Sequence, residues 1–481
     1  MMSRIALPAS TLLLAASLAI LVWMACLQAS PDNVHAALLV AVAYAAFCAV
    51  TLLRHRRRIA GRAFIAAPAD SAGSLLIAHA SQTGQAEELA RRTAEALRDE
   101  GMPVRVDPLG RVEAAGLEIA KRVLFVVSTT GEGDAPDSAA RFTRQVLGRE
   151  ADLRELRYGL LSLGDRSYNH FCGFGRSLEA WLRQQGATPL FDTVEVDNGD
   201  AGALRHWQYH MGLLSGSSRM KDWQPAHYGR WRLAERRLLN PGSLGGEVFH
   251  VALEPLDGQP SWAAGDIAEI GPRDPLDPEA PQPHREYSIA SLPTDGRVEL
   301  LVRRMDHPDG RPGLGSGWLT RHAPLGSAID MRIRTNRSFH APPEDVPLIL
   351  IGNGTGLAGL RSHLKARLAA GRRRNWLIFG ERSRAHDFFY EHEIESWRSR
   401  GWLDRLDLAF SRDQPERLYV QHRLAEAADQ LRRWVDEGAA IYVCGSLIGM
   451  ASGVAAVLEE TLGQDVLDTL AADGRYRRDV Y

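Results

Sequence analysis

Hydrophobic and polar positions follow several patterns along the chain, and each pattern predicts a different structure. Two uncharged apolar runs, 5–27 and 35–53, are each about as long as a helix that crosses a hydrocarbon core of roughly 30 Å. From residue 74, compact apolar runs alternate with helix-periodic stretches, which predicts parallel strands with crossover helices. Over 231–334, short segments alternate with period two between Gly and Pro residues, as in an antiparallel barrel. After residue 346 the strand-and-helix alternation returns.

The two N-terminal runs are predicted to form a transmembrane hairpin. A short polar turn containing Pro31 separates them, Arg4 precedes the first run and the basic cluster Arg54–Arg58 follows the second. The positive-inside rule then places both ends in the cytoplasm. A cleaved signal peptide is the alternative, although the first run is longer than a usual signal core. We therefore expect a multi-pass hairpin in the cell inner (plasma) membrane, with the soluble domains facing the cytoplasm.

Composition and charge narrow the classes of function. At roughly 100–200 residues per domain, 481 residues correspond to about three folded units. The 57 Lys and Arg against 59 Asp and Glu argue against nucleic-acid binding through bulk positive charge. Four cysteines without Cys-x-x-Cys or Cys/His ligand spacing predict no metal site and no disulfide framework. The predicted boundaries are 1–60 for the anchor, 61–73 and 214–230 for linkers, 74–213 and 338–481 for α/β units, and 231–337 for the barrel.

Three polar loops follow three apolar runs in the first α/β unit. The runs 74–80, 122–128 and 158–164 lead into SQTGQA, TTGEGDAPD and DRSYNHFCGFG. Because parallel strands end at one sheet edge, the three loops are expected to converge on one ligand. The first loop precedes a helix predicted for 87–100 and contains no Lys or Arg, so amides and hydroxyls would hold a phosphate there. The Gly-x-x-x-x-Gly-Lys motif of ATP sites is absent from the chain.

These loops, within SQTGQAEELA, STTGEGDAPDSA and LGDRSYNHFCGFG, resemble the FMN loops of flavodoxins and of the diflavin reductase family. The resemblance implies that the first loop holds the FMN phosphate, that the second edges the flavin ring and that Tyr168 stacks on it. Thr130 stands where many relatives have an aromatic residue, which leaves one ring face less covered. The implied FMN contacts are Ser81, Gln82, Thr83, Gly84, Ala86, Thr129, Gly131, Gly133, Tyr168, Asn169 and Phe171.

The barrel segment contains HREYSIAS, which resembles the FAD-binding Arg-x-Tyr-Ser of ferredoxin–NADP reductases. The resemblance implies that Arg285 contacts the pyrophosphate, that Tyr287 lies against the isoalloxazine and that Ser288 bonds near its reactive nitrogen. The sequence GLGSGWL starts a short helix suited to phosphate oxygens, with Gly315, Ser316 and Gly317 as contacts. Diflavin reductases carry a helical connecting domain before the Arg-x-Tyr-Ser strand, whereas only a Pro-rich stretch, 271–283, stands there in this chain.

The last unit resembles the family's nicotinamide-nucleotide domain. VPLILIG leads into NGTGLAGL, where Gly352, Gly354, Thr355 and Gly356 match the Gly-x-Gly-Thr-Gly turn. NADP rather than NAD is implied by cations and hydroxyls where relatives bind the 2′-phosphate. These residues are Ser411, Arg412, Arg417 and Tyr419.

Hydride transfer in the family is assisted by a serine, a cysteine and an acid, which correspond to Ser288, Cys444 and Asp479. Cys444 has an alternative interpretation as a plain buried thiol. The terminal aromatic residue, here Tyr481, shields the flavin and swings aside for the nicotinamide in the family.

The predicted fold class is α/β with a β-barrel unit: a transmembrane hairpin, a flavodoxin-like doubly wound parallel sheet, an antiparallel FAD-binding barrel and a Rossmann-like NADP-binding domain. The implied activity is NADPH-dependent oxidoreduction, with FMN, FAD and NADPH as cofactors. Electrons would pass from NADPH through FAD and FMN to a haem, sirohaem or other iron-containing acceptor protein, docked at an acidic FMN edge that contains Glu132 and Asp134. The alternatives are a ferric-chelate or ferric-siderophore reductase component and an FMN-binding electron-transfer scaffold without pyridine-nucleotide turnover.

Overall fold

The computed structural model describes residues 74–481, apart from 167, 218–222, 224–225, 274–281, 307–309 and 343–344. The predicted anchor, 1–60, and the linker 61–73 lie outside the described residues. Across the part of the chain that is described, no helix combines the length and the apolar character needed to cross a bilayer. This finding overturns the localisation expected above, a multi-pass hairpin in the inner membrane.

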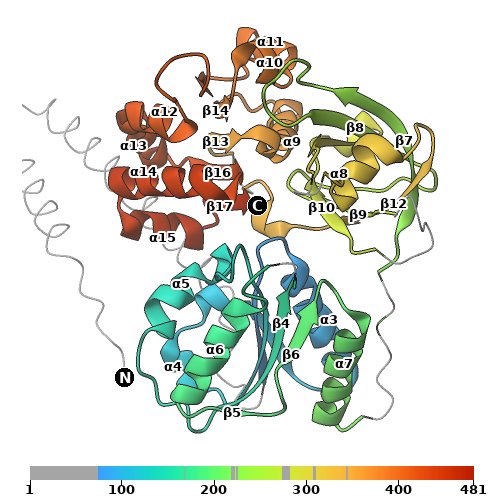
Figure 1. Cartoon of the computed structure of the whole chain (residues 1–481). Coiled ribbons are helices and arrows are strands. Elements are labelled where there is room, and N and C mark those ends of the chain that lie inside the picture. Colours follow the sequence, from blue (N-terminus) through green and yellow to red (C-terminus); the bar gives the residue numbers. More distant parts are fainter. Residues whose placement is uncertain are drawn as a thin grey trace, which may run out of the picture. The chain divides into compact units, whose positions relative to one another are not determined.

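A parallel sheet covered by helices on both faces forms the first α/β part (Figure 1). Its order is β2-β1-β3-β4-β5, with β6 also paired to β4, which is the flavodoxin-like doubly wound order. The central strands are almost continuously apolar because both faces are buried. The strands are β1 (Leu75–Ala80), β2 (Val104–Pro108), β3 (Arg122–Ser128), β4 (Arg157–Gly164), β5 (Thr188–Pro189) and β6 (Val194–Asp197).

Alternate residues of β1 belong to two separate cores. Leu76 and Ala78 pack with α4 (Ala114–Ile119), α5 (Ala140–Phe142) and α6 (Gly173–Gln184). Leu75 and Ile77 instead pack with α3 (Gln85–Asp99) and α7 (Ala201–Ser215). The period-two alternation of a strand therefore serves two helix layers.

Six antiparallel strands form the second sheet, in the order β10-β9-β12-β7-β8-β11. A further antiparallel bridge joins Ile289, the residue after β10, to Leu300 of β11, and this pairing of the two terminal strands closes the predicted barrel. A short helix, α8 (Leu314–Gly317), follows β11. The strands are β7 (Gly229–Leu238), β8 (Val248–Pro255), β9 (Ile267–Gly271), β10 (Arg285–Ser288), β11 (Val298–Arg303) and β12 (Ala328–Arg334).

The third sheet is parallel, with the order β15-β14-β13-β16-β17. Counted from β13, this is the Rossmann order of strands, as predicted. The strands are β13 (Leu348–Asn353), β14 (Asn375–Glu381), β15 (Arg405–Phe410), β16 (Ala440–Gly445) and β17 (Tyr476–Val480). The helices are α9 (Leu357–Ala369), α10 (Arg384–Asp387), α11 (Glu391–Ser399), α12 (Val420–Glu426), α13 (Ala428–Asp436), α14 (Ser452–Leu462) and α15 (Gln464–Ala472).

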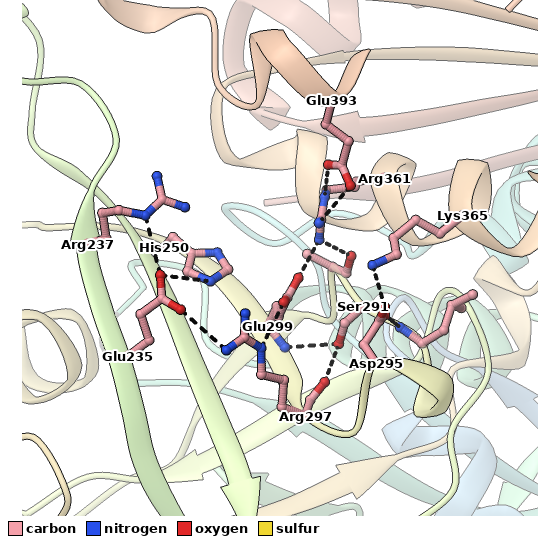
Figure 2. Close-up of polar contacts among 12 residues, drawn as sticks. Glu235, Arg237, His250, Ser291, Asp295, Arg297, Glu299, Arg361, Lys365 and Glu393 are labelled. Carbon is pink, nitrogen blue, oxygen red and sulfur yellow. Dashed lines mark hydrogen bonds and ion pairs between the residues drawn. The ribbon is translucent and has the colours of Figure 1, made fainter. Parts of the chain in front are cut away.

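A buried polar cluster joins the barrel to the third sheet (Figure 2). Arg361 of α9 donates from Nη1 to Glu299 Oε2 of β11 at 2.6 Å and from Nε to Glu393 Oε2 of α11 at 2.6 Å. Lys365 Nζ donates to Asp295 Oδ1 at 2.7 Å. The two parts also share one apolar core, in which barrel residues pack with β13 and α9. The relative position of the two parts is therefore fixed by both apolar and ionic contacts.

Candidate functional site

A cavity of about 1320 Å³ is lined by loop residues of the first α/β part, by barrel residues and by residues of the third sheet and its loops. This volume exceeds the roughly 300–1,000 Å³ of a usual single-ligand pocket, so more than one cofactor has room. The predicted site residues that line it are Thr83, Tyr168, Arg285, Tyr287, Ser288, Gly315, Ser316, Gly354, Thr355, Ser411, Arg412, Tyr419, Asp479 and Tyr481. Motifs spread over 400 residues of sequence thus meet at one place.

Three groups proposed for hydride transfer lie within hydrogen-bonding contact. The Ser288 hydroxyl, at the end of β10, donates to Asp479 Oδ2 at 2.7 Å, and the Cys444 thiol donates to the same oxygen at 3.7 Å. The register of β16 and β17 sets Cys444 beside Asp479. Burial raises the pKa of the Asp479 carboxyl and that of the Cys444 thiol. The site therefore favours the protonated forms of Asp479 and Cys444.

Tyr481 lies at the open side of this group. Its phenolic oxygen is 3.1 Å from Thr355 Oγ1, and 58% of the residue is exposed. Its backbone N–H donates to the Gly445 carbonyl at 3.1 Å, which extends the pairing of β17 with β16. The backbone of Tyr481 is therefore held by strand pairing, whereas its exposed side chain has space to move.

The predicted FAD residues form a close-fitting cradle. A Cβ atom on Gly315 would lie 2.7 Å from Arg285 Cγ and 2.8 Å from the Tyr287 hydroxyl oxygen. The start of α8 thus approaches the Arg-x-Tyr-Ser strand as only glycine permits, with its backbone facing the cavity. Ser316 Oγ accepts a hydrogen bond from Met305 N at 3.1 Å. Gly317 is not part of the lining, because it packs against Pro312.

The turn after β13 packs so closely against β16 that it requires glycine at two positions. A Cβ atom on Gly356 would lie 2.1 Å from the Cys444 carbonyl oxygen, and one on Gly352 would lie 2.4 Å from it. Gly354 has a φ of 56°, in the left-handed region. Gly354 and Thr355 of this turn line the cavity, whereas Gly352 and Gly356 face β16 and do not.

The cavity wall near β15 differs in part from the predicted 2′-phosphate site. Ser411, Arg412 and Tyr419 line the cavity, whereas Arg417 is exposed outside its lining. The lining contains three further cations that sequence reasoning missed, Arg303, Arg304 and Arg382. Arg303 could have been proposed from the sequence, because it lies at the carboxyl end of a predicted barrel strand. In the structure it forms an ion pair with Glu381 of β14.

The first of the loops predicted to bind FMN uses several of its predicted residues to hold its own shape. Ser81 Oγ accepts a hydrogen bond from Ala86 N at 3.2 Å. The Gln82 side chain donates to Asp137 Oδ2 at 3.0 Å and accepts from Asp137 N at 2.9 Å. Gly84 has a φ of 87° and ends the loop at α3. Thr83 is thus the member of the loop that reaches the cavity.

The second and third loops lie mostly outside the cavity lining. Phe171 is only 9% exposed, and the Arg166 guanidinium lies 4.7 Å from its ring centroid, so the structure does not bring this ring to the cavity. Tyr168 is half exposed and lines the cavity. A Cβ atom on Gly133 would lie 2.7 Å from His170 Cβ, and one on Gly131 would lie 3.0 Å from Leu447 Cδ2. The other residues predicted in these loops, Thr129 and Asn169, do not line the cavity.

Two family models match parts of the chain. The model described as flavodoxin matches residues 77–207, and the oxidoreductase NAD-binding domain matches residues 350–456. The sulfite reductase [NADPH] flavoprotein alpha-component of Vibrio vulnificus is 28% identical over 550 residues, covering 87% of this chain and 89% of the relative. The same component of Vibrio cholerae is 27% identical, covering 85% and 88%, and that of Neisseria meningitidis is 27% identical, covering 86% and 91%.

The alignments with these relatives have more positions than this chain contributes residues to them. The alignment with the Vibrio vulnificus relative has 550 positions, while 87% of 481 residues is about 420. The relative therefore carries on the order of a hundred residues without a counterpart here, which is the size of a small domain.

Proposed function

This chain belongs to the diflavin reductase family, and we propose that it passes electrons from NADPH to a haem, sirohaem or other iron-containing acceptor protein. It is an NADPH-dependent flavoprotein oxidoreductase with FMN, FAD and NADPH as cofactors. When bound, these cofactors would supply hydride transfer at the nicotinamide and FAD and one-electron transfer at FMN. The observation that carries the proposal is the single cavity lined by residues from the FMN, FAD and nucleotide motifs.

The proposed roles follow from the geometry of the cavity. Arg285 with the α8 start offers a cation and backbone amides to a pyrophosphate, and Tyr287 offers a flat ring. Ser288 and Asp479 are already hydrogen-bonded to each other, so the serine hydroxyl is oriented before ligands enter. Tyr481 lies at the open side of the group that contains Ser288 and Asp479, so its side chain must move before the nicotinamide can approach.

The acceptor is proposed to dock at the second FMN loop. Glu132 and Asp134 are exposed there, while Asp137 of the same segment forms an ion pair with Arg478 of β17. An exposed pair of carboxylates attracts a basic surface and accelerates its encounter in a salt-dependent manner. We propose that the chain lacks the family's connecting domain and that 214–230 links the flavodoxin-like part directly to the barrel.

Flavin content and turnover test the proposal. The purified protein is expected to release FMN and FAD in equal amounts, and NADPH is expected to bleach the flavin absorbance in a stopped-flow experiment. Release of a single flavin, or no bleaching, would refute the two-flavin scheme. Substitution of Glu132 and Asp134 by Lys should slow the reduction of a haem protein and reverse the salt dependence of its rate. An unchanged salt dependence would place the docking surface elsewhere.

A further inference from the structure

Helix α7 of the flavodoxin-like part carries two histidines one turn apart, His206 and His210, within the sequence HWQYH. Residues at positions i and i+4 lie on the same face of a helix, and their side chains can meet. The Nε2 atoms of the two histidines are 3.1 Å apart. Both lie well inside the helix, whose start is capped by Asp200, where Oδ1 accepts from Ala203 N at 2.7 Å. Regular helix geometry therefore brings the two imidazoles together.

The separation of the two nitrogens suits a metal ion bound between them. Imidazole nitrogens that lie about 2.0–2.1 Å from one ion, at an angle of about 90–109°, are about 2.9–3.4 Å apart. The observed 3.1 Å lies within this range. A hydrogen bond between the rings has the same length, with one Nε2–H donating to the other Nε2. A neutral pair can change from this state to a chelate without losing a proton, because the donor ring can carry its proton on Nδ1 instead.

Neighbouring aromatic residues support one of the two rings and leave the other open to solvent. The His210 ring stacks on Phe191, with the centroids 4.0 Å apart and the planes at 8°. Phe191 in turn meets the buried Trp207 edge to face, at a centroid distance of 5.6 Å. Trp207 Nε1 donates to Thr93 Oγ1 of α3 at 3.0 Å, which attaches this support to the core. His206 is exposed, so an ion can reach the pair from solvent.

We propose that His206 and His210 chelate one divalent transition-metal ion, Zn²⁺ or Cu²⁺, on the surface of the flavodoxin-like part. Imidazole suits these ions, whereas Mg²⁺ and Ca²⁺ prefer oxygen ligands. Within the described part of the chain, no third His, Cys, Asp or Glu forms a cluster with this pair in which all ligand atoms lie within 4.8 Å of one another. Water therefore fills the remaining coordination positions.

The proposed metal site is separate from the cofactor cavity. Neither His206 nor His210 lines that cavity, so the site does not depend on the proposed function. It uses none of the four cysteines on which the expectation of no metal site depended. The buried Trp207 stands where a His-Glu-x-x-His metalloprotease has its general base, so the pair is a binding site and not a hydrolytic centre.

Calorimetric titration of the untagged full chain with Zn²⁺ tests this proposal. The wild type is expected to bind one Zn²⁺ more per chain than a variant in which both histidines are replaced by Gln. The single variants His206→Gln and His210→Gln should each weaken binding at this site at least about 10-fold, because the second ligand no longer binds intramolecularly. His392→Gln is the matched control, since His392 is an exposed histidine of α11 with Phe388 and Ser396 four positions away, and it should leave Zn²⁺ binding unchanged.

Electron paramagnetic resonance with one equivalent of Cu²⁺ identifies the ligands. The wild-type spectrum is expected to show coupling to two imidazole nitrogens, and the spectrum of each single variant coupling to one. Equal Zn²⁺ stoichiometry and affinity in the wild type and the double variant would overturn the site, as would a fall in His392→Gln as large as that in His206→Gln. If His210→Gln does not fold, judged by thermal unfolding in a chelator, the exposed His206→Gln decides alone. NADPH turnover is not part of this measurement, so its failure leaves the proposed function unaffected.

Discussion

Arg361 is the residue whose removal should most weaken the joint between the barrel and the nucleotide domain. The residue is 7% exposed and makes four hydrogen bonds: two to Glu393, one to Glu299 and one to the Ala290 carbonyl oxygen (Figure 2). Its guanidinium also lies 4.5 Å from the ring centroid of Tyr390. Truncation to Ala removes all these contacts at once.

The expected loss is about 3 kcal/mol, the lower end of the roughly 3–5 kcal/mol seen when one partner of a buried ion pair is removed. The lower end applies because neither carboxylate is left wholly isolated. Glu299 retains Arg297 Nε at 3.1 Å, and the Glu393 side chain is 29% exposed, so water can solvate it. With a denaturant slope of about 3 kcal/mol/M for a unit of this size, the urea midpoint should fall by about 1 M.

The loss should depend on pH. Burial raises the pKa of Glu299, but the charge and hydrogen bond of Arg361 outweigh burial and lower it below 4.5. A lowered native pKa contributes stability above the unfolded value, and this contribution is lost as the pH falls through the native value. The difference between wild type and Arg361→Ala should therefore be largest at neutral pH and shrink below about pH 4.5.

Urea unfolding followed by tryptophan fluorescence at pH 7 and pH 4 measures both effects. Arg237→Ala is the matched control, because Arg237 belongs to the same cluster but is exposed, and its pair with Glu235 should contribute less than about 1 kcal/mol. Equal midpoints for wild type and Arg361→Ala at pH 7 would refute the reasoning. A difference that grows as the pH falls would refute its electrostatic part.

Two further predictions concern the cavity. Burial raises the pKa of Asp479, so its favourable contribution to folding is present at low pH and lost as the pH rises through that pKa; Asp479→Asn should therefore gain in melting temperature relative to wild type as the pH rises, while hydride transfer slows. A constant difference across pH would contradict this prediction. Arg412→Ala should raise the KM for NADPH much more than that for NADH, and Arg417→Ala should have the smaller effect because only Arg412 lines the cavity; equal changes for both coenzymes would remove the 2′-phosphate assignment.

The sequence predicted the strands that are buried on both faces. The runs 74–80, 122–128 and 158–164 became β1, β3 and β4, because nearly continuous apolar residues leave little choice of structure. Two barrel strands were harder to predict. In β7 the exposed Arg230 and Arg232 flank the buried Trp231, and in β12 the partly exposed Asp330 and Arg332 flank the buried Met331. Charged residues on one face hide a strand from a search for apolar runs.

The residues that close the site could not be predicted from local pattern. Arg334, Arg361 and Arg303 are charged residues at the ends of strands or on a helix, and in sequence each reads as a solvated surface residue. Their placement depends on partners up to 251 positions away, such as Glu299 for Arg361 and Thr83 for Arg334. No periodicity carries this information, because it depends on how the three sheets are packed.

The two joints of the molecule differ in physical character. The barrel and the third sheet share an apolar core, in which Leu301 and Phe339 pack with Leu357, and hydrophobic contacts of this kind are insensitive to moderate salt. The bonds of the first sheet to the rest are ionic or polar, and the Arg478 pair with Asp137 and the Arg337 pair with Glu87 are examples. Polar interfaces within a chain permit relative domain motion, and ion pairs near the surface weaken as salt rises. The flavodoxin-like part should therefore be the one that separates from the rest of the molecule as the salt concentration rises.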